Sequence, residues 1–153
     1  MTRHTMIILA ALGSLAVLMG AYGFQYLGEM APCKLCYWQR YPHMAAVFIG
    51  LFALMVPGRA LPRLGALAAF TSAAIGFYHT GVEKTWWEGP DTCTSGPVGG
   101  LSASELLDQI MAAPLVRCDE VAWQMFGLSM ASWNVVVSLL LAALWLMAAR
   151  RRS

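Results

Sequence analysis

The chain has 153 residues, of which 59% are hydrophobic and 12% are charged, whereas a soluble domain carries roughly 25% charged residues. This balance excludes a water-soluble globular protein. The net charge of +2 and the mean hydropathy of +0.60 also exclude an intrinsically disordered chain and a basic nucleic-acid-binding protein. The composition predicts one integral membrane domain, residues 1–153.

Four stretches of the chain contain no Asp, Glu, Lys or Arg, and they cover residues 6–28, 41–58, 64–82 and 121–149. A bilayer core about 30 Å thick needs roughly 20 apolar helical residues. The stretches therefore predict an all-α integral membrane four-helix bundle, with spans at about 6–24, 42–57, 64–80 and 129–149. Two prolines and a glycine in residues 57–63 predict a tight turn between the second and third spans.

The charged residues are divided between the two sides of the membrane. Six arginines fall at the N-terminus, in the short link and at the C-terminus: Arg3, Arg59, Arg63, Arg150, Arg151 and Arg152. All eight acidic residues fall in the two other connections, residues 25–41 and 81–128, with only four cations. The positive-inside rule therefore predicts cytoplasmic termini and two outward-facing loops.

A cleaved signal peptide is the competing interpretation of the N-terminal apolar stretch. That stretch exceeds the 7–15 apolar residues typical of a signal peptide. Its removal would also leave three spans and break the charge asymmetry.

All four cysteines lie in the predicted outer loops, Cys33 and Cys36 in the first and Cys93 and Cys118 in the second. Cysteines on an oxidising face normally form disulfides, and pairing within each loop is the simplest of three connectivities. A C-x-x-C pair is typical of redox chemistry, whereas Cys93 and Cys118 could equally form a structural disulfide. A zinc site is less favoured because the second pair is not closely spaced.

The surroundings of Cys36 favour the redox interpretation. The second span is expected to begin near residues 37–44, which places Cys36 close to a helix N-terminus, where the helix dipole stabilises a thiolate. Arg40 lies one helical turn further on the same face, so its charge can pair with that thiolate or with a reduced acceptor. An arginine bound to lipid phosphate is the alternative role.

The sequence APCKLCYWQRYPH at residues 31–43 resembles the first-loop motif of the disulfide bond formation protein B family. The sequence RCDEVAWQMFGLSMASWN at residues 117–134 resembles the start of the fourth span in that family. The resemblance covers the whole chain. It implies a bacterial inner-membrane enzyme that reoxidises a soluble periplasmic dithiol oxidase, a DsbA-like partner, and passes the electrons to membrane quinone, either ubiquinone or menaquinone.

The resemblance also implies roles for the site residues, with disulfides between Cys33 and Cys36 and between Cys93 and Cys118. The reduced partner attacks Cys93, the released Cys118 attacks Cys33, and Cys36 passes the electrons to quinone beside Arg40. The chain has no dinucleotide, haem or iron–sulfur motif, which leaves a lipid-soluble acceptor and no metal.

Three further features concern the outer side of the membrane. A capping-box pattern at residues 102–105 predicts a short amphipathic helix in the second loop, lying on the membrane surface or packed on the loop itself. His79, at the outer end of the third span, is a candidate for the quinone site or an ordinary interfacial histidine. The aromatic residues Trp123 and Phe126 are expected to anchor the start of the fourth run at the interface.

Two rival functions remain open at this point. One is a non-catalytic membrane protein whose loops are held by disulfides for partner binding. The other is a quinone-coupled thiol enzyme of the vitamin K epoxide reductase type, which the position of the C-x-x-C pair before the second span argues against.

Overall fold

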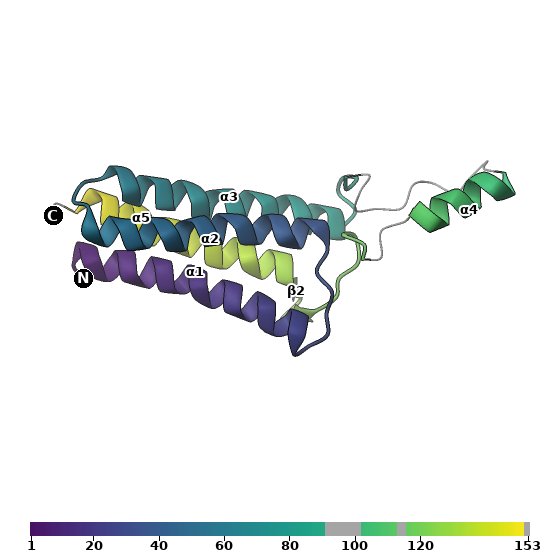
Figure 1. The fold of residues 1–153 in the computed structure, drawn as a ribbon, viewed down its shortest axis with the longest axis horizontal. Coiled ribbons are helices and arrows are strands. Elements are labelled where there is room, and N and C mark those ends of the chain that lie inside the picture. The colour runs from purple at the N-terminus through teal and green to yellow at the C-terminus, as the bar shows by residue number, and fades with distance from the viewer. Residues whose placement is uncertain (91–101, 113–115, 152–153) are drawn as a thin grey trace.

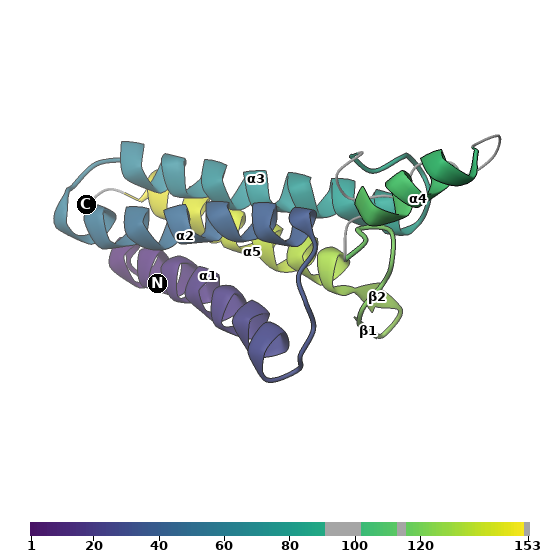
Figure 2. The same ribbon diagram turned by 45° about the vertical axis from the view of Figure 1, so that its right-hand side comes forward.

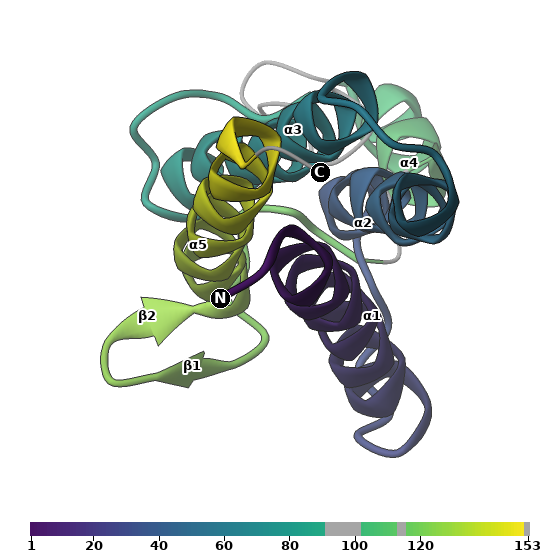
Figure 3. The ribbon, with the colours of Figure 1, turned by 90° about the vertical axis from the view of Figure 1, so that its left-hand side faces the viewer.

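The computed structural model describes residues 1–90, 102–112 and 116–151, in which four long helices form one bundle (Figure 1). These helices are α1 (Arg3–Tyr26), α2 (Lys34–Met55), α3 (Ala60–Glu83) and α5 (Met130–Arg150). Viewed along the bundle, they follow the ring order α1, α2, α3, α5, and each packs against its two neighbours (Figure 3). The predicted all-α four-helix bundle is confirmed.

The bundle has small side chains inside and large apolar side chains outside. Its buried positions include Ala10, Ala46, Ala53, Ala66, Ala69 and Ala73. Its exposed positions include Leu12, Met19, Phe48, Leu67, Phe70 and Leu140. Small residues let helices approach closely where lipid tails, rather than water, solvate the exterior.

Within the part of the chain that the structure describes, three helices, α1, α3 and α5, are long and apolar enough to cross a membrane. Helix α2 carries Lys34 and Arg40 in its first two turns, which lowers its hydropathy. A crossing by the predicted second span, residues 42–57, of which α2 covers 42–55, therefore stays a prediction.

Three of the helices begin at residues whose side chains cap them. Thr2, Cys33 and Ser129 each accept a hydrogen bond from the backbone N–H three residues further on, which satisfies one of the free donors at a helix start. Because Cys33 caps α2, this helix begins at Lys34, before the expected start near residues 37–44. The first predicted outer loop is thus partly helical.

The turn between α2 and α3 is held by Arg3, which is 5% exposed. Its Nη2 donates to the carbonyl oxygens of Ala53, Val56 and Gly58, at 3.2, 3.3 and 3.0 Å. These carbonyls lie at the C-terminal end of α2 and just beyond it, where they have no partner within the helix. Arg3 therefore joins the first turn of α1 to the end of α2.

At the opposite end, α4 (Ala103–Ala112) projects beyond the bundle (Figure 1). It confirms the short helix predicted in the second loop, while the glycine-rich residues 91–100 lie outside the described residues. The strands β1 (Gln124–Met125) and β2 (Leu128–Ser129) form an antiparallel hairpin. Phe126 and Gly127 turn it with φ of 53° and 75°, the left-handed pair that a two-residue hairpin turn needs.

Helix α1 diverges from the other three helices toward this end (Figure 2). Trp123, just before the hairpin, packs on Phe24 of α1 with ring centroids 5.1 Å apart. This is the end of the bundle that carries Cys33 and Cys36.

Candidate functional site

Cys33 and Cys36 lie at the N-terminal end of α2 and are both free thiols. Their Sγ atoms are 2.9 Å apart, longer than the roughly 2.05 Å of a disulfide bond. The Sγ of Cys33 also accepts from the backbone N–H of Cys36 at 3.2 Å. The structure thus holds this pair in its dithiol form, and its predicted disulfide stays a prediction.

The two thiols differ in acidity, and both lie outside the predicted span. The hydrogen bond donated by the Cys33 thiol is the largest factor that lowers the pKa of Cys36, and the charge of Arg40 lowers it further against the effect of burial. The same hydrogen bond, together with burial, raises the pKa of Cys33. Cys36 is therefore the more acidic of the two thiols.

Arg40 is 7% exposed and lies one turn beyond Cys36. Its Nη1 donates to Gln25 Oε1 at 2.6 Å and its Nη2 to the carbonyl of Ala21 at 3.4 Å. Its guanidinium lies 5.0 Å from the ring centroids of both Tyr22 and Tyr37, a distance at which cation–π attraction acts. The side chain is held inside the protein rather than directed to a lipid headgroup.

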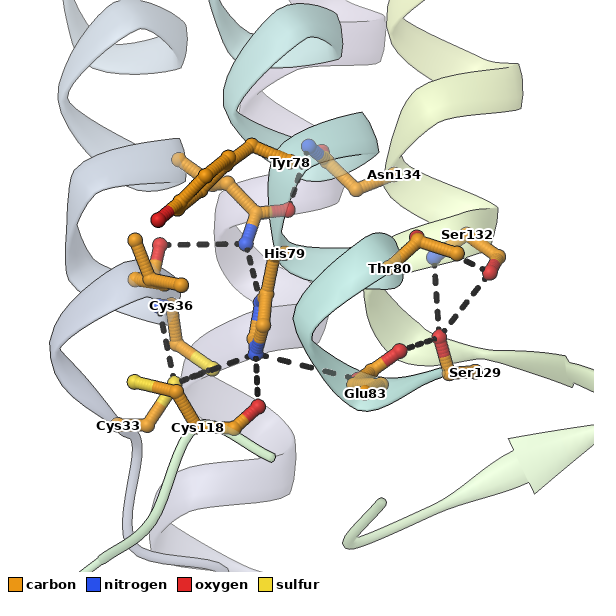
Figure 4. Close-up of polar contacts among 12 residues, drawn as sticks. Cys33, Cys36, Tyr78, His79, Thr80, Glu83, Cys118, Ser129, Ser132 and Asn134 are labelled. Carbon is orange, nitrogen blue, oxygen red and sulfur yellow. Dashed lines mark hydrogen bonds and ion pairs between the residues drawn. The ribbon is translucent and has the colours of Figure 1, made fainter. Parts of the chain in front are cut away.

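His79 of α3 lies between two of the cysteines (Figure 4). Its Nε2 is 3.6 Å from the Cys33 Sγ and 3.2 Å from the carbonyl oxygen of Cys118. Its Nδ1 is 2.9 Å from Gln39 Nε2. The structure therefore places His79 next to the Cys33 sulfur, whereas the sequence placed it only at the outer end of the third span.

Cys118 is fully buried and disulfide-bonded, and it packs in one cluster with Cys33, Leu35 and Val82. Cys93, its predicted disulfide partner, lies outside the described residues. The neighbouring Arg117 is exposed and pairs with Asp119, Nε to Oδ1 at 2.9 Å, which lowers the pKa of that carboxyl group. Cys118 and Cys33 thus already belong to one packed cluster.

A cavity of about 230 Å³ lies among α1, α2, α5 and residues 30–32. Its walls are mainly apolar, and its polar lining comes from Cys36, Gln39, Arg40, His43, His79 and Asn134. It is therefore a largely hydrocarbon-lined site with a sulfur, a cation and hydrogen-bonding groups on its wall.

Several residues of this site were missed by the sequence reasoning. Gln39, Asn134 and Ser72 are linked by hydrogen bonds inside the bundle. His43, one turn beyond Arg40, is a residue whose role the sequence left open, and it is 1% exposed. Polar side chains within membrane spans are costly and usually functional. The presence of Gln39, Ser72 and Asn134 in or beside apolar stretches was a signal that could have identified them.

The sulfurs of Cys33 and Cys36 and a ring nitrogen of His79 lie within 4.8 Å of one another. Two thiolates and an imidazole are ligands that zinc accepts. The same spacing also suits a histidine that hydrogen-bonds a redox-active dithiol.

Comparison with known proteins identifies a family for nearly the whole chain. The family model described as disulfide bond formation protein DsbB matches residues 3–148. The disulfide bond formation protein B of Pasteurella multocida is 33% identical over 139 residues, which cover 84% of this chain and 77% of that protein. The protein of the same name from Aromatoleum aromaticum is 30% identical over 92% of this chain and 91% of its own length. No solved structure matches the chain.

Proposed function

The chain belongs to the disulfide bond formation protein B family, and from that membership we propose that it is a quinone-dependent thiol:disulfide oxidase. Membership itself gives a multi-pass membrane protein with a role in disulfide bond formation. The proposal adds a soluble periplasmic DsbA-like dithiol as electron donor and a membrane quinone as acceptor. It also places both termini in the cytoplasm, as the charge distribution predicts.

The cavity that begins at Cys36 and Arg40 is the observation that carries the proposal. Its apolar walls suit a hydrocarbon-soluble ring, and within the described residues two groups accept hydrogen bonds from the five N–H groups of Arg40. The remaining N–H groups are available to a carbonyl oxygen of a ligand. Bound at this place, quinone would supply a sink for two electrons.

The protein's own cysteines carry the electrons by thiol–disulfide exchange. A thiolate of the partner attacks Cys93 and releases Cys118, which attacks Cys33 and releases Cys36. The partner's second thiol then resolves its mixed disulfide with Cys93 and leaves oxidised. Cys93 attacks Cys118 and regenerates that disulfide, which leaves Cys33 and Cys36 as a dithiol.

The dithiol finally returns to a disulfide, and its two electrons and two protons convert quinone to hydroquinone. Overall, one partner dithiol becomes a disulfide and one quinone becomes a hydroquinone.

Residues around the dithiol favour its oxidation by quinone in two ways. Arg40 favours the Cys36 thiolate by its charge, and its fixed guanidinium can bind an oxygen that becomes negative. The burial of Cys33 and Cys118 excludes water and foreign thiols from the exchange between the loops.

The test mixes the purified full-length protein with a reduced dithiol partner and a soluble quinone, and follows quinone absorbance without oxygen. We expect quinone loss by the native protein and none by Cys36→Ser, because the serine hydroxyl cannot donate electrons. Thr71→Val, which removes a hydroxyl on the exposed face of α3, is the control and should retain the native rate. If Cys36→Ser lost only stability and kept the rate, the non-catalytic interpretation with disulfide-held loops would replace the proposal.

A further inference from the structure

A chain of buried hydrogen bonds crosses the bundle from α5 to the cysteines. Asn134 of α5 donates from Nδ2 to Gln39 Oε1 of α2 at 2.8 Å, and Gln39 Nε2 is 2.9 Å from His79 Nδ1 of α3. On its other side, Asn134 Oδ1 is 3.0 Å from His43 Nε2. One asparagine thus contacts one histidine directly and the other through Gln39, and both histidines line the cavity.

Two backbone carbonyls fix the orientation of the amides in this chain. Asn134 Nδ2 is 3.2 Å from the carbonyl oxygen of Ser72, and Gln39 Nε2 is 3.2 Å from that of Leu35. A carbonyl oxygen can only accept, so the side-chain atom facing each one must be an NH₂ nitrogen. The Ser72 hydroxyl, which donates to the carbonyl of Gln39, adds a further acceptor at 3.1 Å from Asn134 Nδ2.

This orientation decides where His79 carries its proton. Because Gln39 Nε2 donates, His79 Nδ1 must accept, and the proton of the neutral ring lies on Nε2. The groups around Nε2 agree, since the Cys118 carbonyl and the Cys33 sulfur can both accept a hydrogen bond from it, and the Glu83 carboxylate lies 3.9 Å away. His79 therefore presents a donor to the place where Cys118 and Cys33 meet.

The same argument decides the state of His43. Asn134 Oδ1 accepts, so His43 Nε2 carries the proton and His43 Nδ1 is an unprotonated acceptor. Ser138 fits this assignment, because its hydroxyl donates to Asn134 Oδ1 and lies 3.2 Å from His43 Nε2. Within the described residues, His43 Nδ1 is buried and has no hydrogen-bond partner, which is costly unless a ligand supplies one.

We propose that Asn134 and Gln39 are positioning residues that fix His43 and His79, respectively, with the proton on Nε2. His79 is thereby a hydrogen-bond donor at the sulfurs, and His43 keeps an unpaired acceptor in a residue that lines the cavity. Relying on the proposed function, the cavity offers Arg40 as donor to a carbonyl oxygen of a quinone, and the two histidines hold the polar wall beside it.

The proposal also decides between the two interpretations of the cluster formed by Cys33, Cys36 and His79. A histidine nitrogen must be unprotonated to bind a metal. With the proton on Nε2, the nitrogen that faces the sulfurs is a donor, so the cluster hydrogen-bonds rather than coordinates.

The test is ¹⁵N NMR of the full-length protein with labelled histidine in lipid nanodiscs, which reports the protonated nitrogen of each ring. The chain has three histidines, and His4 is exposed and serves as the reference. We expect His43 and His79 each to show one tautomer, protonated at Nε2. A proton on Nδ1 of either ring in the native protein would overturn the proposal.

Three variants separate positioning from folding. Gln39→Glu removes the donor to His79 and should place a proton on His79 Nδ1, while His43 is unchanged. Asn134→Leu removes the acceptor that faces His43 Nε2 and should release His43 from a single tautomer, whereas His79 keeps its donor because Leu35 still orients Gln39. The control, Thr71→Val, lies next to Ser72 but outside the chain of hydrogen bonds and should change neither ring. Unchanged spectra in both Gln39→Glu and Asn134→Leu would contradict the proposal.

A kinetic measurement on the same samples keeps this inference distinct from the proposed function. We expect Gln39→Glu to slow quinone reduction roughly tenfold, the equivalent of about 1.4 kcal/mol, with KM for quinone less affected than kcat. If the native tautomers are found but no quinone is reduced by the native protein, the proposed function fails and the positioning role stands. An unchanged kcat in a variant with an altered His79 tautomer would overturn the link to catalysis.

Discussion

Arg3 and Arg40 are buried to a similar degree at opposite ends of the bundle, yet their partners differ in kind. Arg3 donates from one nitrogen to three backbone carbonyls at the end of α2. Arg40 donates to one carbonyl and one side-chain oxygen, lies between two tyrosine rings and lines the cavity. Burial of a charge alone therefore does not indicate a functional site, whereas an adjoining cavity and a fixed guanidinium do.

The largest effect is expected from Arg40→Met, which keeps a long side chain and removes the guanidinium. Quinone reduction should fall about 10²-fold, as happens when one donor to a developing negative charge is lost. The rate is measured by quinone absorbance with the reduced dithiol partner. Arg40→Lys is the matched control and should fall in between, because it keeps the charge but loses the planar fork. A native rate in Arg40→Met would contradict a role of Arg40 in quinone reduction.

A smaller effect, on stability alone, is expected from Arg3→Met. Loss of the charged hydrogen bonds to the end of α2 should cost about 2 kcal/mol of unfolding free energy, measured by thermal unfolding in detergent. The rate of quinone reduction per folded molecule should stay native, because Arg3 is remote from the cavity. Arg59→Met, at an exposed arginine on the same turn, should change neither quantity. A lower rate without lower stability in Arg3→Met would contradict the structural role.

The smallest effect concerns acidity at Cys36. Arg40 is a lesser cause of its lowered pKa than the hydrogen bond from Cys33, so Arg40→Met should raise the pKa only in part. The thiolate fraction near neutral pH then falls, and the pH profile of alkylation at Cys36 moves to higher pH. Arg3→Met should leave the profile in place. A profile that moved equally in both variants would indicate a general effect of unfolding.

The sequence predicted the features that depend on local patterns. Charge-free runs located the four helices, the proline and glycine link located the turn between the second and third, and the expected start of the second span placed Cys36 near a helix N-terminus. The extra turns of α2 were missed because a cysteine sulfur acts as its N-cap. The turn at Phe126 and Gly127 was also missed, because phenylalanine rarely adopts a positive φ.

The contacts that assemble the site could not be predicted, because they depend on how separate helices are rotated and packed. His79 was a candidate by its depth in the third span, but its neighbours Gln39 and Cys118 come from other parts of the chain. The sequence predicts Arg3 only as one of the arginines on the cytoplasmic side, whereas the packing of α1 against α2 buries its side chain. Sequence patterns identify the elements, and their packing determines which side chains meet.

The cap of α2 has a consequence for the energetics of electron transfer. In the proposed function, the sulfur that accepts the backbone N–H of Cys36 is also a redox-active atom, and a disulfide sulfur is a weaker acceptor than a thiol or thiolate. The first turn of the helix is therefore better capped when the pair is reduced. By linkage, the free energy that the cap adds to the dithiol raises the reduction potential of the pair by the equivalent amount. The start of α2 thus responds to the number of electrons that the site holds.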